Sequence, residues 1–332
     1  MIFSDMKIKT PGLALHIKNF IDDHLLPDDY KDWVMYSKLS FDKTKNSIST
    51  TINSNIKLKQ PTVYIGFEPY LVGSHLDPSR NGFSIENARG STGGLPLGVG
   101  YDNPDNLTKR EYMERGALIT TCDFQPECEY IPFLALHPRL DPSGTRLYNN
   151  NTRPYKIGYM NRTTCGRREM MFDSLVKRLG VEQCHSLGEC CGAHPETRQK
   201  MTNPRTVNDS WYNDQLYQQY SRYQFMIAME NTSTPGYITE KLYNALLAGC
   251  IPIYYGDKIA KEIFNQKCFI NITDFDTFES CAEYISKLTD QQIIEMRSQP
   301  MFTTCSKYID PTSSHYDDIR LNINKLVKSY EN

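Results

Sequence analysis

The sequence predicts an α/β protein with a parallel sheet in each of two domains. Short apolar runs typical of buried strands alternate with amphipathic stretches typical of helices in both halves of the chain. The 332 residues are enough for two domains of ordinary size, each with its own core. Turn-forming residues crowd into 141–154, DPSGTRLYNNNTRP. We therefore expect a domain boundary there, with one domain over 1–152 and the other over 153–332.

The first domain is expected to contain one helix and four strands with a Gly-rich loop between them. The helix covers 13–26, and the strands cover 33–36, 62–66, 118–122 and 130–133. The loop, RGSTGGLPLGVG over 89–100, matches neither the Walker pattern nor the G-x-G-x-x-G fingerprint. A surface loop is the expected structure and a loop that faces a substrate is the alternative, and the sequence does not indicate its role.

The second domain is expected to begin with a strand over 155–160 and a helix over 166–179 that Gly180 ends. Arg167 and Arg168 stand at the start of this helix. A cation there opposes the helix dipole, so the placement is unfavourable unless an anion is bound nearby. A strand over 268–272, a helix over 278–288 and a last helix over 317–329 complete the domain.

The most informative stretch covers 223–257, YQFMIAMENTSTPGYITEKLYNALLAGCIPIYYGD. It predicts a buried strand over 225–229, a polar turn over 230–236, a helix that Gly249 ends, and a second strand over 250–255. Thr239 is the expected N-cap of the helix. Four polar residues then collect where a strand ends and a helix begins: Asn231, Tyr237, Glu240 and Lys241. Open α/β folds bind ligands at such corners, and free helix N–H groups attract phosphate there.

Two such corners in the second domain each offer a cation, Arg168 at one and Lys241 at the other. If both corners line one crevice, the two side chains clamp a diphosphate, with arginine as a fork and lysine as a point charge. The alternative is that both are ordinary solvated surface cations.

Charge and hydropathy exclude two classes of partner. The chain has 37 basic and 39 acidic residues, a net charge of −2, which gives no general footprint for nucleic acid. No run approaches the roughly 18 apolar residues that a membrane span needs.

The N-terminal residues lack a secretory pattern, which indicates a cytoplasmic protein as the chain stands. Ten cysteines and several N-x-S/T sequons would suit a secretory lumen if an N-terminal anchor had been removed. Disulfide pairing and oligomeric state stay open.

Two patterns raise the question of a metal. Asp274-Phe275-Asp276 has the spacing of a divalent-metal motif, but it lies where a helix is expected to start, so an N-cap role is the preferred interpretation. A second pattern, Cys184, His185, Cys190, Cys191 and His194, contains no C-x-x-C pair, and a loop with free thiols or one local disulfide is preferred. We therefore predict no metal site and no required cofactor.

The stretch 223–256 resembles the signature of the α1,3/α1,4-fucosyltransferases, which is close to F-x-(L/C)-x-F-E-N-(S/T), then Y-(V/I)-T-E-K, then an alanine and (V/I)-P-(V/I). Here the three blocks are 225–232, 237–241 and 245–253, in the same order and spacing. One departure is Met229 where the family prefers Phe, a conservative core change. The resemblance implies an inverting GT-B glycosyltransferase that uses GDP-fucose. We expect it to be metal-independent, because the two cations can do a metal's work on the diphosphate. Its two Rossmann-like domains would face an interdomain cleft, with the donor on the C-terminal domain and the acceptor glycan on the other.

The same resemblance implies roles for five residues of the second domain. Lys241 is similar to the family's diphosphate-binding lysine, and Arg168 in GRREMMFDSL to the arginine that pairs with it, with Arg167 as the competing choice. Glu240 resembles the donor-binding glutamate. Tyr237 matches the tyrosine near the nucleotide, and Asn231 the asparagine near the fucose.

In the first domain, 63–69, VYIGFEP, resembles the strand end where the family has its acidic base, which implies that Glu68 is the catalytic base. The alternative for Glu68 is a solvated loop carboxylate. The implied reaction is transfer of L-fucose from GDP-fucose to a hydroxyl of an acceptor glycan, most consistent with an α1,3-type linkage, as in protein glycosylation. The alternatives are the same fold with another nucleotide sugar, and a non-catalytic GDP- or glycan-binding relative. The acceptor and the linkage position are not indicated.

Overall fold

The structure of the chain is a computed structural model, and it describes part of the sequence. The described residues are 2–4, 20–21, 23–26, 35–36, 63–66, 118–122, 124, 128–149, 152–161, 165–199, 213–231, 233–303 and 306–331. The predicted base Glu68 and the Gly-rich loop 89–100 lie outside them. The chain divides into two compact units: unit 1 is Met1–Pro138 with Lys307–Asn332, and unit 2 is Arg139–Ser306.

This division corrects the predicted domains 1–152 and 153–332. The turn-rich segment belongs to unit 2, because the amide of Leu147 donates to the carbonyl of Leu247 at 2.8 Å and the amide of Asp141 donates to the Tyr243 hydroxyl at 3.0 Å. The turn-forming residues 141–154 therefore belong to a segment that packs on unit 2, and the boundary between the units lies before this segment.

The C-terminal helix α10 (Ser314–Glu331) belongs to unit 1 although it ends the chain. Its Asn322 donates to Glu129 at 2.6 Å, His315 Nε2 lies 2.8 Å from the carbonyl of Tyr130, and Arg320 donates to the carbonyl of His24 at 3.0 Å. These contacts are made across the sequence, so the helical pattern of 317–329 could not reveal them.

Unit 1 contains a parallel five-stranded sheet in the order β2-β1-β3-β4-β5. Its strands are β1 (Ile2–Ser4), β2 (Met35–Tyr36), β3 (Val63–Gly66), β4 (Leu118–Thr121) and β5 (Glu129–Tyr130). The predicted strand over 130–133 is wrong in its extent, because the chain turns after β5 into the buried 3₁₀ helix η2 (Phe133–Leu136).

Unit 2 contains a second parallel sheet, in the order β10-β9-β8-β6-β7. Its strands are β6 (Tyr155–Tyr159), β7 (Cys184–Ser186), β8 (Tyr223–Met229), β9 (Ile251–Tyr255) and β10 (Ile270–Asn271). A parallel sheet in each half confirms the predicted α/β class. The predicted strand over 268–272 is shorter than expected, because 3₁₀ helices η5 (Gln266–Cys268) and η6 (Ile272–Asp274) flank β10.

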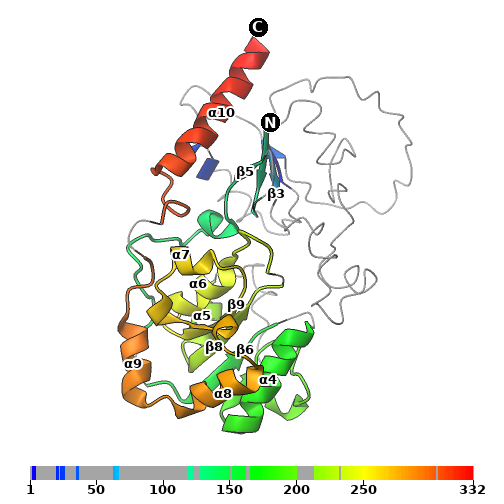
Figure 1. Cartoon of the computed structure of the whole chain (residues 1–332), viewed down its shortest axis with the longest axis vertical. Coiled ribbons are helices and arrows are strands. Elements are labelled where there is room, and N and C mark those ends of the chain that lie inside the picture. The colour runs from blue at the N-terminus through cyan, green and yellow to red at the C-terminus, as the bar shows by residue number, and fades with distance from the viewer. Residues whose placement is uncertain are drawn as a thin grey trace, which may run out of the picture. The chain divides into compact units, whose positions relative to one another are not determined.

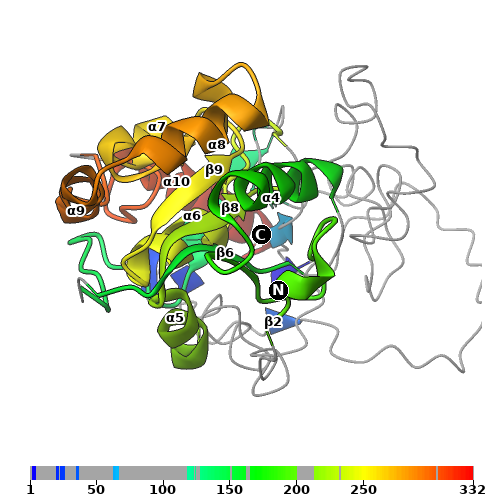
Figure 2. The ribbon, with the colours of Figure 1, turned by 90° about the horizontal axis from the view of Figure 1, so that it is seen from below.

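Helices cover both faces of the unit 2 sheet (Figures 1 and 2). They are α4 (Gly166–Leu179), α5 (Asp214–Tyr220), α6 (Glu240–Leu247), α7 (Ala260–Ile263), α8 (Phe278–Lys287) and α9 (Asp290–Ser298), with the 3₁₀ helix η3 (Pro195–Thr197). The bounds of α4 are those predicted, and Gly180 follows it with φ 86°. Gly249, at φ 71°, likewise follows the end of α6, which is the left-handed conformation that ends a helix readily at glycine.

Strand β8 shows how the sheet is buried from both sides. Phe225, Ile227 and Met229 belong to the core that α4 and α8 complete. The intervening Met226 and Ala228 are also buried and, by the alternation of a strand, point to the opposite face, where α5 and α6 pack. The strand is therefore apolar throughout, as its sequence predicts for a central parallel strand.

Strand β7 occupies 184–186, the first three residues of the segment 184–194 that was predicted to be a thiol-bearing loop. Cys184, His185 and Ser186 are buried and pair with β6, and His185 Nδ1 lies 3.0 Å from the Tyr223 hydroxyl. Cys184, Cys190 and Cys191, the cysteines of that segment, are free thiols. No cluster of three or more His, Cys, Asp or Glu side chains suited to a metal ion occurs within the described part. Within that part, too, no helix is long and apolar enough to cross a membrane.

Candidate functional site

The order of strands in unit 2 creates a switch point between β6 and β8. From β6 the chain passes through α4 to β7 on one side, and from β8 it passes through α6 to β9 on the other. Ligands of open α/β sheets bind outside the carboxyl ends of the two strands at such a point. The carboxyl ends here are Tyr159 and Met229, and the polar residues predicted from the sequence lie just beyond them.

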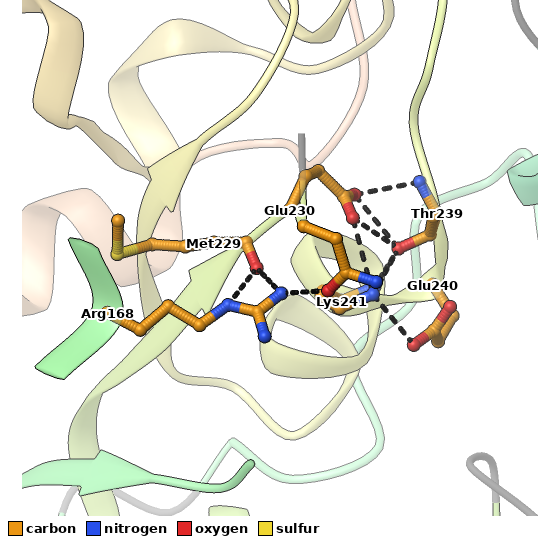
Figure 3. Close-up of polar contacts among 7 residues, drawn as sticks. Arg168, Met229, Glu230, Thr239, Glu240 and Lys241 are labelled. Atoms are coloured by element: carbon orange, nitrogen blue, oxygen red, sulfur yellow. Dashed lines mark hydrogen bonds and ion pairs between the residues drawn. The ribbon is translucent and has the colours of Figure 1, made fainter. Parts of the chain in front are cut away.

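Arg168 reaches from the first turn of α4 to the end of β8. Its Nε and Nη2 donate to the carbonyl of Met229 at 3.0 and 2.8 Å, and Nη2 also donates to Asn231 Oδ1 (Figure 3). The residue is 3% exposed, so the fork is held in one orientation. Its Nη1 has no hydrogen-bond partner among the described residues, and it is the donor that remains for a ligand oxygen.

The structure separates the roles of the two neighbouring arginines. Arg167 lies over the ring of Tyr255, with its Cζ 5.0 Å from the ring centroid, and donates to the Tyr255 hydroxyl at 2.7 Å. Its guanidinium therefore binds an aromatic side chain, whereas that of Arg168 lies at the switch point. This placement favours Arg168 over Arg167 as the ligand-facing arginine.

Lys241 lies in the first turn of α6, and its ammonium lies among polar side chains. Nζ lies 3.3 Å from Glu230 Oε2, 3.5 Å from Glu240 Oε1 and 3.0 Å from Thr239 Oγ1. The Lys241 side chain is 24% exposed. Thr239 is the N-cap of α6, as predicted, and its hydroxyl accepts from the amide of Lys241.

The loop before α6 is tied to the end of β9. The amide of Gly236 donates to Asp257 Oδ1 at 2.9 Å, and the Ser233 hydroxyl donates to the carbonyl of Gly256 at 3.1 Å. Tyr237 in the same loop is buried, and its amide donates to the carbonyl of Thr234 at 3.0 Å. These bonds fix the approach of the chain to the helix N-terminus.

The structure brings the five predicted residues of unit 2 to one end of β8. Arg168 contacts Met229 and Asn231, and Lys241 contacts Glu230 between them and lies next to Glu240 (Figure 3). Tyr237 lies in the loop that leads into α6. Two cations and the N-terminal N–H groups of α6 thus lie together. This arrangement can hold an anion with several oxygens.

The carboxylate of Glu230 has a central place that the sequence interpretation missed. It was assigned to a polar turn, yet its side chain is completely buried and contacts both Thr239 and Lys241. The available signal was its position directly after a buried strand and before Asn231. In contrast, Asp274 of the possible metal motif pairs with Lys261 at 2.6 Å and closes η6, where the sequence interpretation expected a helix start.

Comparison with known families places this site in a recognisable domain. Residues 156–296 match the sequence profile described as glycosyltransferase family 10 (fucosyltransferase) C-terminal domain. The match begins in β6, ends in α9 and includes every predicted site residue of unit 2.

Similar sequences include a putative fucosyltransferase of Acanthamoeba polyphaga mimivirus, 31% identical over 187 residues that make up 55% of this chain and 28% of the relative. Another is the α-(1,3)-fucosyltransferase B of Drosophila melanogaster, 36% identical over 132 residues, 39% of this chain and 28% of the relative. The matches thus span little more than a quarter of the length of these relatives.

A similar solved structure is a crystal structure of an α1,3-fucosyltransferase. It aligns with a TM-score of 0.52 over 98% of this chain and 89% of that chain, at 13% sequence identity. Such a likeness shows the fold, and it confirms the α/β fold of the GT-B class.

Proposed function

We propose, because residues 156–296 match the profile of glycosyltransferase family 10, that the chain transfers L-fucose from GDP-fucose to a hydroxyl of an acceptor glycan. The transfer inverts the anomeric configuration and forms an α1,3-type linkage. One observation carries the proposal: Arg168 and Lys241 come from separate strand-to-helix corners and contact consecutive residues, 229–231, at the end of β8. The name of the Drosophila relative supports the sugar and the linkage.

The proposed donor chemistry follows from the charge that the reaction develops. The sugar passes through a state with oxocarbenium character while the diphosphate leaves with added negative charge. Nη1 of Arg168, the ammonium of Lys241 and the N–H groups at the start of α6 stabilise that charge. These cations do the work that a divalent metal does in other transferases, so we expect no metal requirement.

The remaining site residues have proposed roles in donor recognition and proton transfer. Glu240 accepts hydrogen bonds from donor hydroxyls, Tyr237 lies near the nucleotide, and Asn231, which also holds Arg168, lies near the fucose. Glu68 takes the proton of the acceptor hydroxyl as general base. Its support is the resemblance of 63–69 and its place two residues beyond the end of β3 in the sequence.

A nucleotide screen tests this proposal against its two alternatives. GDP and GDP-fucose are expected to raise the melting temperature of the full chain far more than UDP or GDP-mannose, with or without EDTA. A ligand at a hundred times its Kd stabilises a protein by about 2.7 kcal/mol. Release of GDP from GDP-fucose with a panel of acceptor glycans is the second readout.

The outcomes of the screen separate the candidates. Stabilisation by UDP or another nucleotide sugar in preference to GDP-fucose indicates a transferase with another donor. Stabilisation by GDP without turnover on any glycan indicates a non-catalytic relative. Loss of turnover in EDTA contradicts the metal-independent mechanism.

A further inference from the structure

A buried carboxylate to which the proposed reaction gives no role lies next to Lys241. The side chain of Glu230 is 0% exposed, while that of Lys241 is 24% exposed and that of Glu240 is 11% exposed. Taking a carboxylate out of water costs several kcal/mol unless it is paired and hydrogen-bonded. The contacts of Glu230 therefore identify what it holds.

Among the described residues, the side-chain hydrogen bonds of Glu230 all go to the start of α6. Glu230 Oε1 accepts from the amide of Thr239 at 2.8 Å. The Thr239 hydroxyl lies 2.9 Å from Oε1 and 2.8 Å from Oε2 of the same carboxylate. Lys241 Nζ lies 3.3 Å from Oε2 and donates to the same Thr239 hydroxyl at 3.0 Å. Because that hydroxyl has one proton, it donates to the carboxylate and accepts from the ammonium (Figure 3).

The backbone around Glu230 holds this carboxylate in a fixed position. Its amide donates to the carbonyl of Tyr255 at 2.7 Å, which anchors it to β9. Gly256 leaves room for the side chain, since a Cβ at that position would lie 2.9 Å from Glu230 Cγ. Glu230 is therefore held by the sheet, whereas Glu240 is a residue of α6 itself, with its side chain 11% exposed.

We propose that Glu230 is a positioning residue: through the Thr239 hydroxyl and a direct ion pair it fixes the Lys241 ammonium where a diphosphate binds. The inference rests on the proposed function for the identity of the nucleotide, and on the geometry alone for the action of Glu230 through Lys241. Glu240, whose carboxylate also lies near the ammonium, is then the partner that the diphosphate replaces, while Glu230 keeps its contact.

The test measures the Kd of GDP by equilibrium dialysis for the full chain and four single variants, Glu230→Gln, Thr239→Val, Thr239→Ser and Lys241→Ala. Glu230→Gln and Thr239→Val are expected to weaken GDP about tenfold, the scale of a coupling energy between residues in one network. Thr239→Ser, which keeps the hydroxyl, stays within about twofold of the wild type. Glu169→Gln serves as a control, because Glu169 is bonded to Tyr159 and Cys165 and not to Lys241.

The decisive measurement is the Kd of GDP for two double variants, in which Lys241→Ala is combined with Glu230→Gln or with Thr239→Val. When Lys241→Ala is already present, Glu230→Gln and Thr239→Val are expected to cause no further loss of GDP affinity, because their action passes through the missing ammonium. Losses that add to that of Lys241→Ala overturn the inference. Tighter GDP binding by Glu230→Gln also overturns it, because the carboxylate then only repels the diphosphate. If Glu230→Gln does not fold, the Thr239→Val and Thr239→Ser pair decides by the same criteria.

Inorganic pyrophosphate separates this inference from the proposed function. Wild-type protein that binds pyrophosphate but shows no preference for GDP contradicts the guanosine nucleotide, and the same variants then test Glu230 with pyrophosphate as ligand. If the wild-type protein binds GDP, but the losses of GDP affinity in the Glu230 and Thr239 variants add to that of Lys241→Ala, only the positioning role is contradicted. Protein that binds neither ligand contradicts both.

Discussion

Lys241→Ala is expected to weaken the binding of GDP about 100-fold and to abolish the thermal stabilisation by GDP at concentrations that saturate the wild type. Truncating one partner of a hydrogen-bonded charge pair in a binding site costs about 2–5 kcal/mol, and each 1.4 kcal/mol is tenfold in affinity. The variant also leaves the buried carboxylate of Glu230 without its ammonium, so a lower melting temperature of the free protein is expected as well. Calorimetric titration with GDP and thermal melts measure the two effects.

Two matched controls make this result specific. Lys261→Ala removes a lysine of similar exposure that pairs with Asp274, and it is expected to leave GDP affinity unchanged. Arg167→Gln is expected to change GDP affinity less than about threefold, while Arg168→Gln weakens it by an amount similar to Lys241→Ala. Retained tight binding by Lys241→Ala, or equal losses from the two arginine variants, would contradict the clamp.

Glu68→Gln is expected to lower the rate of fucose transfer by about 10²–10⁴-fold, the contribution of a positioned general base. The amide is close to the carboxylate in size but cannot take the proton of the acceptor hydroxyl. GDP affinity should stay within about twofold of the wild type, since the donor residues all belong to unit 2. Transfer rates with GDP-fucose and an accepted glycan, beside GDP titrations, measure both.

The control for Glu68→Gln is Glu129→Gln, in strand β5 of the same unit. Glu129 accepts a hydrogen bond from Asn322. Glu129→Gln is therefore expected to lower the stability of the protein and to leave the rate of fucose transfer unchanged. Transfer by Glu68→Gln at the wild-type rate would refute the assignment of the base. A parallel loss of GDP binding would show that Glu68 acts on the donor.

The helices and strands that build the proposed donor site could be predicted because their signals are local. The apolar stripe of 166–179 and the glycine after it mark α4, and the threonine cap at 239 marks the start of α6. With the strand β8 before it, this pattern was sufficient to bring Asn231, Glu240 and Lys241 to one corner. The convergence of Arg168 on that corner needed the parallel pairing of β6 with β8, which the alternation of strands and helices predicts only as a class.

The features that the sequence did not reveal depend on contacts between distant segments. The burial of Glu230 depends on the hydrogen bond from its amide to the carbonyl of Tyr255 and on the space at Gly256. No local pattern of polar residues indicates either contact. Strand β7 has three residues, too few to show an alternation, and pairing with β6 defines it. The C-terminal helix was recognisable, but its hydrogen bonds to Glu129, Tyr130 and His24 decide to which unit it belongs.

A crystal structure of the chain with GDP bound would test the diphosphate clamp most directly. We expect diphosphate oxygens at hydrogen-bond distance, about 2.7–3.2 Å, from both Arg168 Nη1 and Lys241 Nζ, beyond the carboxyl ends of β6 and β8. A diphosphate that contacts neither side chain, or that lies away from this end of the sheet, would contradict it.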